Sequence, residues 1–392
     1  MRSSFLAILV LTLLFFSCSE DTVENEDFSR IIEDGSYNNA YFPVGIRETL
    51  DGGAIVVSAI SSEPENYPGV VVTKIDDDGF WENESTLGSP YVSPSGEIME
   101  SDSLFYFFCM DENNFRTYIV SVNQEGEMGN PVPLGGSPTF PLAGNLINDQ
   151  FFLLSYDAQN KRSVVSAHTA DGNQTGSFSY TIGEGSDADP LILSHFAQRK
   201  SRLPFFIGEW GNGNVYFNGL YNFSLSLVFS NFTDTPAGVV QGQSDEGGVN
   251  ALLQLEDGNY AVAGFQFETN FIRPDQALNE QGISSSINFL DRDIPEIKAN
   301  SNVDIISYTI EPESYTVVAA ETESRQIVLY FYQDEILIAA EYIGYLNGFN
   351  LGEIIVTEDN SILLLASTYT AGRFERIYVE KLSESRISKI LP

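Results

Sequence analysis

A strand pattern of apolar and β-branched residues recurs about every 51 residues, and it constrains the fold of this chain more than any other feature. The first unit reads as two strands, 54–60 and 69–75, joined by a polar loop. Turns rich in aspartate and glycine lie at 51–53 and 76–79, where glycine takes a positive φ without a Cβ clash. With one further strand on either side, the unit predicts a four-stranded antiparallel sheet.

The strand at 55–58 has six equivalents further along the chain, and almost nothing in the sequence has helical periodicity. A period of this length suits a propeller blade of four strands. We therefore expect an all-β fold, a β-propeller of seven four-stranded blades. Six or eight blades remain compatible, because the repeats are degenerate. The six equivalent strands lie at 105–108, 151–154, 215–218, 261–264, 316–319 and 363–366.

The best-formed repeat, LEDGNYAVAG at 255–264, resembles propeller repeats of the DGGYxVAG type. The resemblance extends over about residues 40–391 and implies the fold. It implies little about function, because propellers support many chemistries. Two ways of closing the ring fit the sequence: 386–391 forms the outer strand of the last blade, or 28–32 pairs there and fastens the two ends, which we favour.

The amino terminus has the features of a targeting segment. Arg2 precedes a twelve-residue apolar run that is too short to span a bilayer. The run ends at Ser17-Cys18 and resembles the signal peptide of bacterial lipoproteins, although Phe15 stands where leucine is usual. The resemblance implies a signal peptide at 1–17 and a lipid on Cys18, with an ordinary secretory signal as the alternative.

An acidic stretch, SEDTVENED, follows Cys18. Its composition predicts a flexible tether over 18–40, followed by a propeller domain over 41–392. Such acidic stretches resemble the export signals of lipoproteins displayed on the outer face of some Gram-negative outer membranes. The resemblance implies a protein anchored to the outer membrane and facing the cell exterior, with the periplasmic side as the alternative.

Charge and motifs exclude several function classes. A net charge of −36 argues against nucleic acid as a partner, because its phosphates would be repelled. Cys109 lies in an apolar strand and reads as a buried, inert thiol. His168 and His195 belong to no motif, and the sequence has no nucleophile elbow, zinc spacing or phosphate loop. We expect no cofactor and no metal.

The predicted geometry puts the tight turns on one rim of the ring and the longer loops on the other, where a ligand would bind. The longest of these loops is expected at 267–283. Scarce basic residues gather on this side, as do aromatic ones, which favours an anionic ligand because arginine binds carboxylates and sulfates through two hydrogen bonds. The alternative is that loops collect charge of both signs. The candidate ligand-binding residues are Arg162, Arg273, Arg325, Arg373, Arg199, Lys200, Arg202, Tyr221, Phe271 and Tyr369.

The sequence thus favours a lipid-anchored binding module of the cell envelope, with an anionic glycan or an acidic protein surface as its ligand. Two alternatives stay open: a polysaccharide-acting hydrolase or lyase, and a structural subunit of an outer-membrane complex. Carboxylates that converge in a pocket with shifted pKa values would indicate the enzyme. Arginines and aromatic rings around an open funnel would indicate the binding module.

Overall fold

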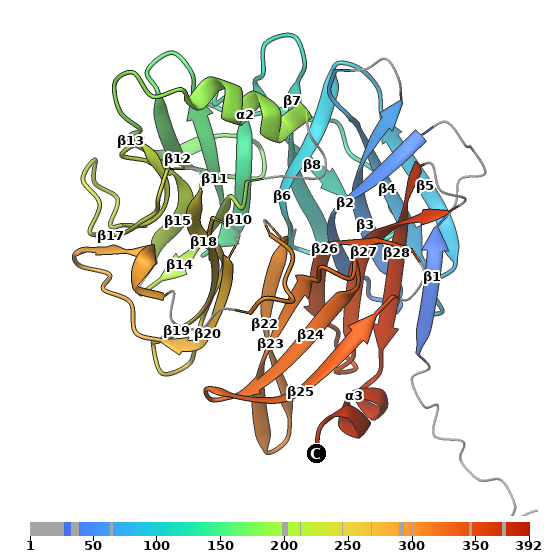
Figure 1. Ribbon diagram of the computed structural model, residues 1–392. Coiled ribbons are helices and arrows are strands. Elements are labelled where there is room, and N and C mark those ends of the chain that lie inside the picture. The colour runs from blue at the N-terminus through green and yellow to red at the C-terminus, as the bar shows by residue number, and fades with distance from the viewer. Residues whose placement is uncertain are drawn as a thin grey trace, which may run out of the picture.

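Seven β-sheets form a ring in the computed structural model, which confirms the predicted β-propeller (Figure 1). Five of the seven sheets have four strands, one has five and one has three. We number these sheets as blades 1 to 7 from the sheet that begins with β2. The structure describes residues 27–32, 39–62, 66–197, 203–211, 213–244, 246–267, 269–289, 294–299, 301–344, 347–370 and 374–392.

Each blade runs outward from an innermost strand near the ring axis, and each of the seven repeated strands predicted from the sequence is the second strand of its blade. Blade 1 comprises β2 (Asn39–Glu48), β3 (Ala54–Ser62), β4 (Gly69–Ile75) and β5 (Trp81–Leu87). Blade 2 comprises β6 (Tyr91–Ser101), β7 (Leu104–Asp111), β8 (Thr117–Val122) and β9 (Val132–Pro133). Blade 3 comprises β10 (Pro141–Ile147), β11 (Gln150–Asp157), β12 (Arg162–His168) and β13 (Gln174–Thr181).

The remaining blades follow the same order around the ring. Blade 4 comprises β14 (Phe206–Trp210), β15 (Asn214–Tyr221), β16 (Ser224–Ser230) and β17 (Gly238–Gln241), with β21 (Ile283–Ser285) added in parallel. Blade 5 comprises β18 (Gly247–Gln254), β19 (Tyr260–Gln266) and β20 (Thr269–Gln276). Blade 6 comprises β22 (Val303–Ile310), β23 (Glu313–Glu321), β24 (Ile327–Gln333) and β25 (Ile336–Ile343). Blade 7 comprises β26 (Phe349–Val356), β27 (Ile362–Thr370), β28 (Phe374–Leu382) and β1 (Phe28–Ile32).

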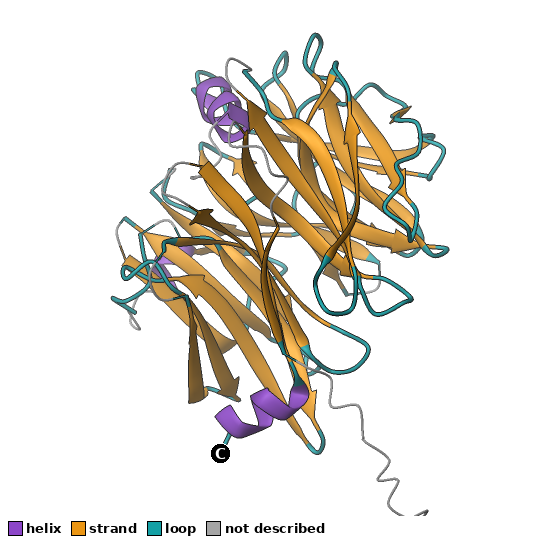
Figure 2. Ribbon diagram, turned by 90° about the vertical axis from the view of Figure 1, so that its right-hand side faces the viewer, coloured by secondary structure: helices purple, strands orange, loops and turns teal. Residues whose placement is uncertain are grey.

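A cluster of buried apolar side chains lies between each pair of neighbouring blades, so the core is divided around the ring. Each blade can bury both of its faces in this way, and strands such as β4 and β19 are therefore buried at almost every position. The tight turns after the first and third strands form one rim, which we call the turn rim. The opposite rim, the loop rim, carries helix α2 (Ala188–Ala197) between blades 3 and 4 (Figure 2).

Ring closure uses the amino-terminal strand. Phe28 pairs with Lys381 and Ile32 pairs with Ile377, so β1 becomes the outer strand of blade 7 and confirms the fastened alternative. The segment at 386–391, considered as an outer strand, lies largely in helix α3 (Glu384–Ile390). Strand β1 falls within the predicted tether at 18–40 and β2 begins at Asn39, so the propeller starts before the predicted boundary at residue 41.

Blades 4 and 5 depart from the sequence expectation. The predicted long loop at 267–283 is wrong, because β20 occupies Thr269–Gln276 and pairs with β19. Its apolar positions escaped notice because polar residues interrupt them. After β20 the chain crosses to blade 4, where Val239 pairs with Ile283 in parallel, and blade 5 keeps three strands. Helix α2 and the short 3-10 helix η1 (Ser286–Phe289) were also not foreseen.

Candidate ligand site in the central channel

A cavity of about 600 Å³ lies on the ring axis, lined by residues from all seven innermost strands and from helix α2. Its apolar surface includes Phe206, Phe265 and Tyr216. Amide and hydroxyl groups from Asn145 and Ser301 add polar surface. A cavity of this size and mixed lining lies within the range of small-molecule sites.

Bulges in the innermost strands shape the cavity. The register of β2 shifts between Pro43 and Gly45, which leaves Val44 as the extra residue. The same irregularity occurs in β10, β18 and β26, at Leu142, Asn250 and Gly352. All four extra residues line the cavity, because a bulge turns a side chain away from the regular alternation of the strand.

A cluster of four charged residues separates this cavity from a pocket on the turn rim; we call it the channel floor and define it as Arg47, Glu97, Asp304 and Glu353. The three carboxylates line the cavity, whereas Arg47 lines the pocket on the turn rim. Arg47 Nη1 donates to Glu353 Oε1 at 2.6 Å. Arg47 Nη2 lies 4.0 Å from Glu97 Oε2.

Two of the three carboxylates join neighbouring blades. Glu353 Oε2 accepts a hydrogen bond of 2.8 Å from the backbone N–H of Ile46 in blade 1. Asp304 accepts two hydrogen bonds of 2.8 Å, one from Ile305 beside it and one from Ile354 in blade 7. Among the described groups, Glu97 is the floor carboxylate that accepts no hydrogen bond, and its side chain is 52% exposed to the cavity.

Two carboxyl groups of the floor, Glu97 and Asp304, have raised pKa values. Burial within the ring raises the pKa of Glu97 to about 7; nearby Arg47 opposes the shift, and Glu353 and Asp304 add to it. Burial, followed by the charge of Glu353, raises the pKa of Asp304 to about 6. The exposed half of Glu97 faces the cavity inside the ring, where the surrounding protein disfavours the ionised form of this carboxyl.

Two buried hydroxyls line the cavity on the same strand as Glu97. Ser93 and Ser95 of β6 are 3% and 6% exposed. In the described part of the chain, neither Oγ atom has a hydrogen-bond partner. Buried polar groups without a partner are unusual in native proteins, so these hydroxyls mark a place where a ligand group would be favourable.

The mouth of the cavity lies on the loop rim. His195 of α2 lines it, and the His195 Nδ1 atom accepts a hydrogen bond of 3.1 Å from the backbone N–H of Leu203. The imidazole packs edge-on against Phe196 and Phe205. These contacts hold α2 against the inner edge of blade 4.

None of the sequence-predicted ligand-binding residues that the structure describes lines this cavity. Arg162 and Arg325 are exposed, and Arg162 Nη1 donates to Ser179 Oγ at 3.2 Å. Tyr221 and Tyr369 are half-buried near the ends of their strands. Four of the predicted basic residues and the cysteine predicted to carry a lipid lie outside the described residues: Arg199, Lys200, Arg202, Arg373 and Cys18.

Arg273 and Phe271 require a correction, because both belong to strand β20 and not to a loop. Arg273 is 8% exposed and pairs with Val262 of β19. Phe271 pairs with Gly264, and a Cβ atom added to Gly264 would lie 2.3 Å from the phenyl ring of Phe271. The glycine thus makes room for a core aromatic ring, which explains why Phe271 is buried.

Sequence reasoning missed the channel floor, although a short pattern could have revealed it. Each floor carboxylate stands before two apolar residues on an innermost strand: EIM at 97–99, DII at 304–306 and EII at 353–355. An acid in the same place on three inner strands is unexpected where apolar residues dominate. Among the described residues, no group of three or more histidine, cysteine, aspartate or glutamate side chains could hold a metal ion.

No family model and no curated protein matches the chain. The chain is similar to the core factor of S. cerevisiae, with 10% identity and a TM-score of 0.50 over 96% of this chain and 64% of that one. It is also similar to the β-propeller domain of the Trilobed protease from Pyrococcus furiosus (9% identity, TM-score 0.47, 89% and 96% covered). A third similar structure is a glucose dehydrogenase (9% identity, TM-score 0.43, 90% and 98% covered). At such identities the likeness concerns the fold and not the function. No described helix is both long and apolar enough to span a membrane.

Proposed function

We propose that this protein is a ligand-binding module of the cell envelope that captures a small molecule, or the end of a polymer, in its central cavity. The observation that carries the proposal is the cavity itself: about 600 Å³ of space on the ring axis, with polar groups converging on it. Ligand sites usually combine an apolar lining with a few placed polar groups, as this one does.

The use of the floor carboxylates favours binding over glycoside hydrolysis. Hydrolysis of a glycosidic bond needs two carboxyl groups that can reach the bond from either side. Glu353 and Asp304 already accept hydrogen bonds from backbone N–H groups of neighbouring blades. Among the described floor carboxylates, Glu97 is the one whose oxygens accept no hydrogen bond from the backbone. A single available carboxyl suits ligand recognition better than acid–base catalysis, which needs two.

The anchor completes the proposal. A lipid on Cys18 would hold the protein on the outer membrane, on the side that faces the cell exterior. Strand β1 begins at Phe28 on the turn rim, so a tether from Cys18 would bring that rim toward the membrane and leave the cavity mouth facing away. Cys18→Ala is expected to release a folded protein into the soluble fraction. Continued pelleting of this variant with the outer membrane would contradict the anchor.

The decisive experiment narrows the cavity and screens for ligands. The full-length protein is tested by native mass spectrometry against a panel of metabolites and oligosaccharides, together with Val44→Trp, which places a large ring in the cavity. Val356→Trp is the matched control, because Val356 is partly exposed on the turn rim. Ligands of the wild type should be lost in Val44→Trp and kept in Val356→Trp. Ligands that bind all three proteins equally would contradict the central site.

A second candidate is an acidic glycan bound on the loop rim. Its supporting observation is that Arg162 and Arg325 are both exposed there. The double variant Arg162→Ala/Arg325→Ala should then lose affinity for acidic oligosaccharides, and the wild type should lose it in high salt, because screening weakens exposed charge pairs. Binding that responds to Val44→Trp and not to this double variant would exclude the second candidate.

A further inference from the structure

The channel floor carries an excess of negative charge. With its side chains ionised, three carboxylates face one guanidinium, which gives a net charge of −2. Burial disfavours charge that has no counter-charge nearby, so binding of a positively charged group at the floor is favourable. A carboxylate, sulfate or phosphate would meet repulsion at the same place.

The acceptors in the cavity suit a cation that donates several hydrogen bonds. Glu97, Ser93 and Ser95 of β6 all line the cavity, and none of the three side chains has a hydrogen bond among the described residues. An ammonium group has three donors and no acceptor. The Glu97 carboxylate and the two hydroxyls offer acceptors to such a group at the cavity wall.

Aromatic rings supply the rest of the environment. Phe206, Phe265 and Tyr216 line the cavity, and the rings of Phe206 and Tyr216 meet edge to face. A cation is attracted to the face of an aromatic ring, the more so where water is excluded. The combination of an acidic floor and aromatic walls selects an organic cation over a fully hydrated inorganic one.

Resting on the function proposed above, we infer that the cavity recognises an amine: a ligand whose ammonium group is held by Glu97, Ser93 and Ser95, with its carbon skeleton against the aromatic walls. The ligand class is therefore a small organic amine or a polymer end that bears an amino group. This differs from the anionic ligand expected for the loop rim.

Binding should depend on pH through the floor. The charged and titratable groups around Glu97 are Arg47 from β2, Tyr216 from β15, Asp304 from β22 and Glu353 from β26, and His195 from α2 lines the same cavity. The pKa of Glu97 is raised to about 7, so the carboxyl holds a proton at pH 5.5 and releases it by pH 8. An ammonium ligand favours the ionised carboxylate, and its affinity should rise over this interval.

Three probes that share one ring test the proposal on the full-length protein. Benzylamine, benzyl alcohol and benzoate differ in the charge of the head group. At pH 8, benzylamine should bind at least about tenfold more tightly than the other two, which corresponds to roughly 1.4 kcal/mol. Its affinity should fall roughly tenfold at pH 5.5, while that of benzyl alcohol stays level. Equilibrium dialysis or isothermal titration calorimetry measures both.

Glu97→Gln removes the charge and keeps the shape, so it should abolish the preference for benzylamine and leave benzyl alcohol unaffected. Glu100→Gln is the matched control, because this exposed carboxyl of the same strand lines the turn-rim pocket instead of the cavity. Equal binding of benzoate, an amine preference that survives Glu97→Gln, or no detectable binding of benzylamine would each overturn the inference. If benzyl alcohol or benzoate binds without an amine preference and is lost in Val44→Trp, the cavity remains the ligand site and only the amine class fails.

Discussion

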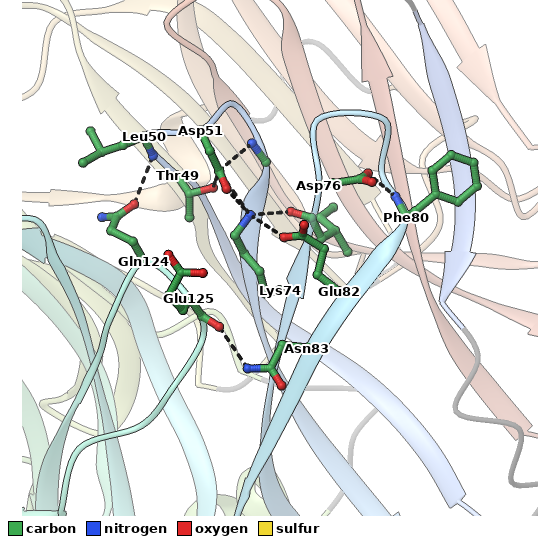
Figure 3. Close-up of polar contacts among 12 residues, drawn as sticks. Thr49, Leu50, Asp51, Lys74, Asp76, Phe80, Glu82, Asn83, Gln124 and Glu125 are labelled. Atoms are coloured by element: carbon green, nitrogen blue, oxygen red, sulfur yellow. Dashed lines mark hydrogen bonds and ion pairs between the residues drawn. The ribbon is translucent and has the colours of Figure 1, made fainter.

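Two charged clusters of similar composition behave in opposite ways. In blade 1, Lys74 is 1% exposed and donates to Asp51 Oδ2 at 3.0 Å, to Glu82 Oε2 at 3.1 Å and to the backbone oxygen of Ile75 (Figure 3). We call these residues the turn clamp. Burial acts to raise the pKa of Asp51, but hydrogen bonds from Thr49, Lys74 and Gly53 outweigh it and lower the pKa to about 2. In the channel floor, the pKa of Glu97 is shifted the other way and is raised to about 7.

The difference comes from the ratio of charges and from where the carboxylates face. The clamp surrounds one ammonium with two half-exposed carboxylates that keep contact with water. The floor gives three carboxylates one guanidinium and holds them inside the ring. Shifts of the second kind, with an acid held above its ordinary pKa in a cavity, are the ones that accompany ligand or catalytic sites.

Repetition separates the two clusters as well. Blade 7 has a second clamp, in which Lys381 Nζ lies 2.6 Å from Asp359 Oδ2. Its turn repeats the first, since Thr357 donates to Asp359 as Thr49 donates to Asp51, both at 2.5 Å. A device that recurs in equivalent turns serves the blade. The floor, by contrast, draws residues from four different blades, so it is a property of the closed ring.

The largest expected effect comes from deleting residues 1–38, which removes β1 beside the first clamp. Phe28 packs against Gly79 of blade 1, and the Arg30 guanidinium lies 4.3 Å from the centre of the Phe80 ring. Exposing the surface that Phe28 and Ile32 cover should lower the free energy of unfolding by roughly 3–6 kcal/mol, measured by denaturant titration. A protein that lacks only residues 1–26 is the control; equal midpoints for both would show that β1 does not fasten the ring.

Lys74→Ala should break the first clamp. The substitution removes a buried four-carbon stem and leaves Asp51 and Glu82 without their shared cation, at a cost of about 2–3 kcal/mol in unfolding free energy. Cavity binding should not change. The control is Lys389→Ala, an exposed lysine in α3. If Lys74→Ala unfolds no more easily than this control, the clamp contributes nothing and the contrast with the floor weakens.

The sequence predicted the repeated features and missed those that arise only on closure. Turns such as 51–53 and strands such as 363–366 follow from local glycine, aspartate and β-branched patterns, and the blade count follows from their spacing. The floor could not be derived in this way, because Arg47 and Glu353 are 306 residues apart and meet only when blade 7 closes on blade 1. The sequence pattern predicts a loop at Arg273, because a charged residue within a short strand interrupts the apolar pattern that identifies strands.

The clamps should weaken in acid. Asp51 and Asp359 both have a pKa of about 2 in the folded protein, below the ordinary 3.8. Their stabilisation is complete above pH 4 and is lost as pH falls toward 2, where the folded state must take up the proton. The double variant Asp51→Asn/Asp359→Asn should therefore lose less unfolding free energy than the wild type as pH falls. The difference is roughly 1 kcal/mol or less, because solvent screens these carboxylates. Denaturant midpoints between pH 2 and pH 5 measure it, and an unchanged slope would contradict the assignment.

Glu97→Gln should have the smallest effect and the opposite sign. The folded protein holds the Glu97 proton up to about pH 7, whereas the unfolded chain releases it near the ordinary 4.5. Stability from this group therefore falls as pH rises between those values, and it stays low above them. Glu97→Gln should remove that slope and, at pH 8, raise the free energy of unfolding by up to about 1 kcal/mol, because the half-exposed carboxyl is partly screened. Asp304, with a pKa of about 6, keeps a weaker slope of the same sign in the variant. A loss of stability at pH 8, with Glu100→Gln unchanged, would mean that Glu97 mainly holds Arg47 in place. The floor would then be a structural clamp like the one around Lys74.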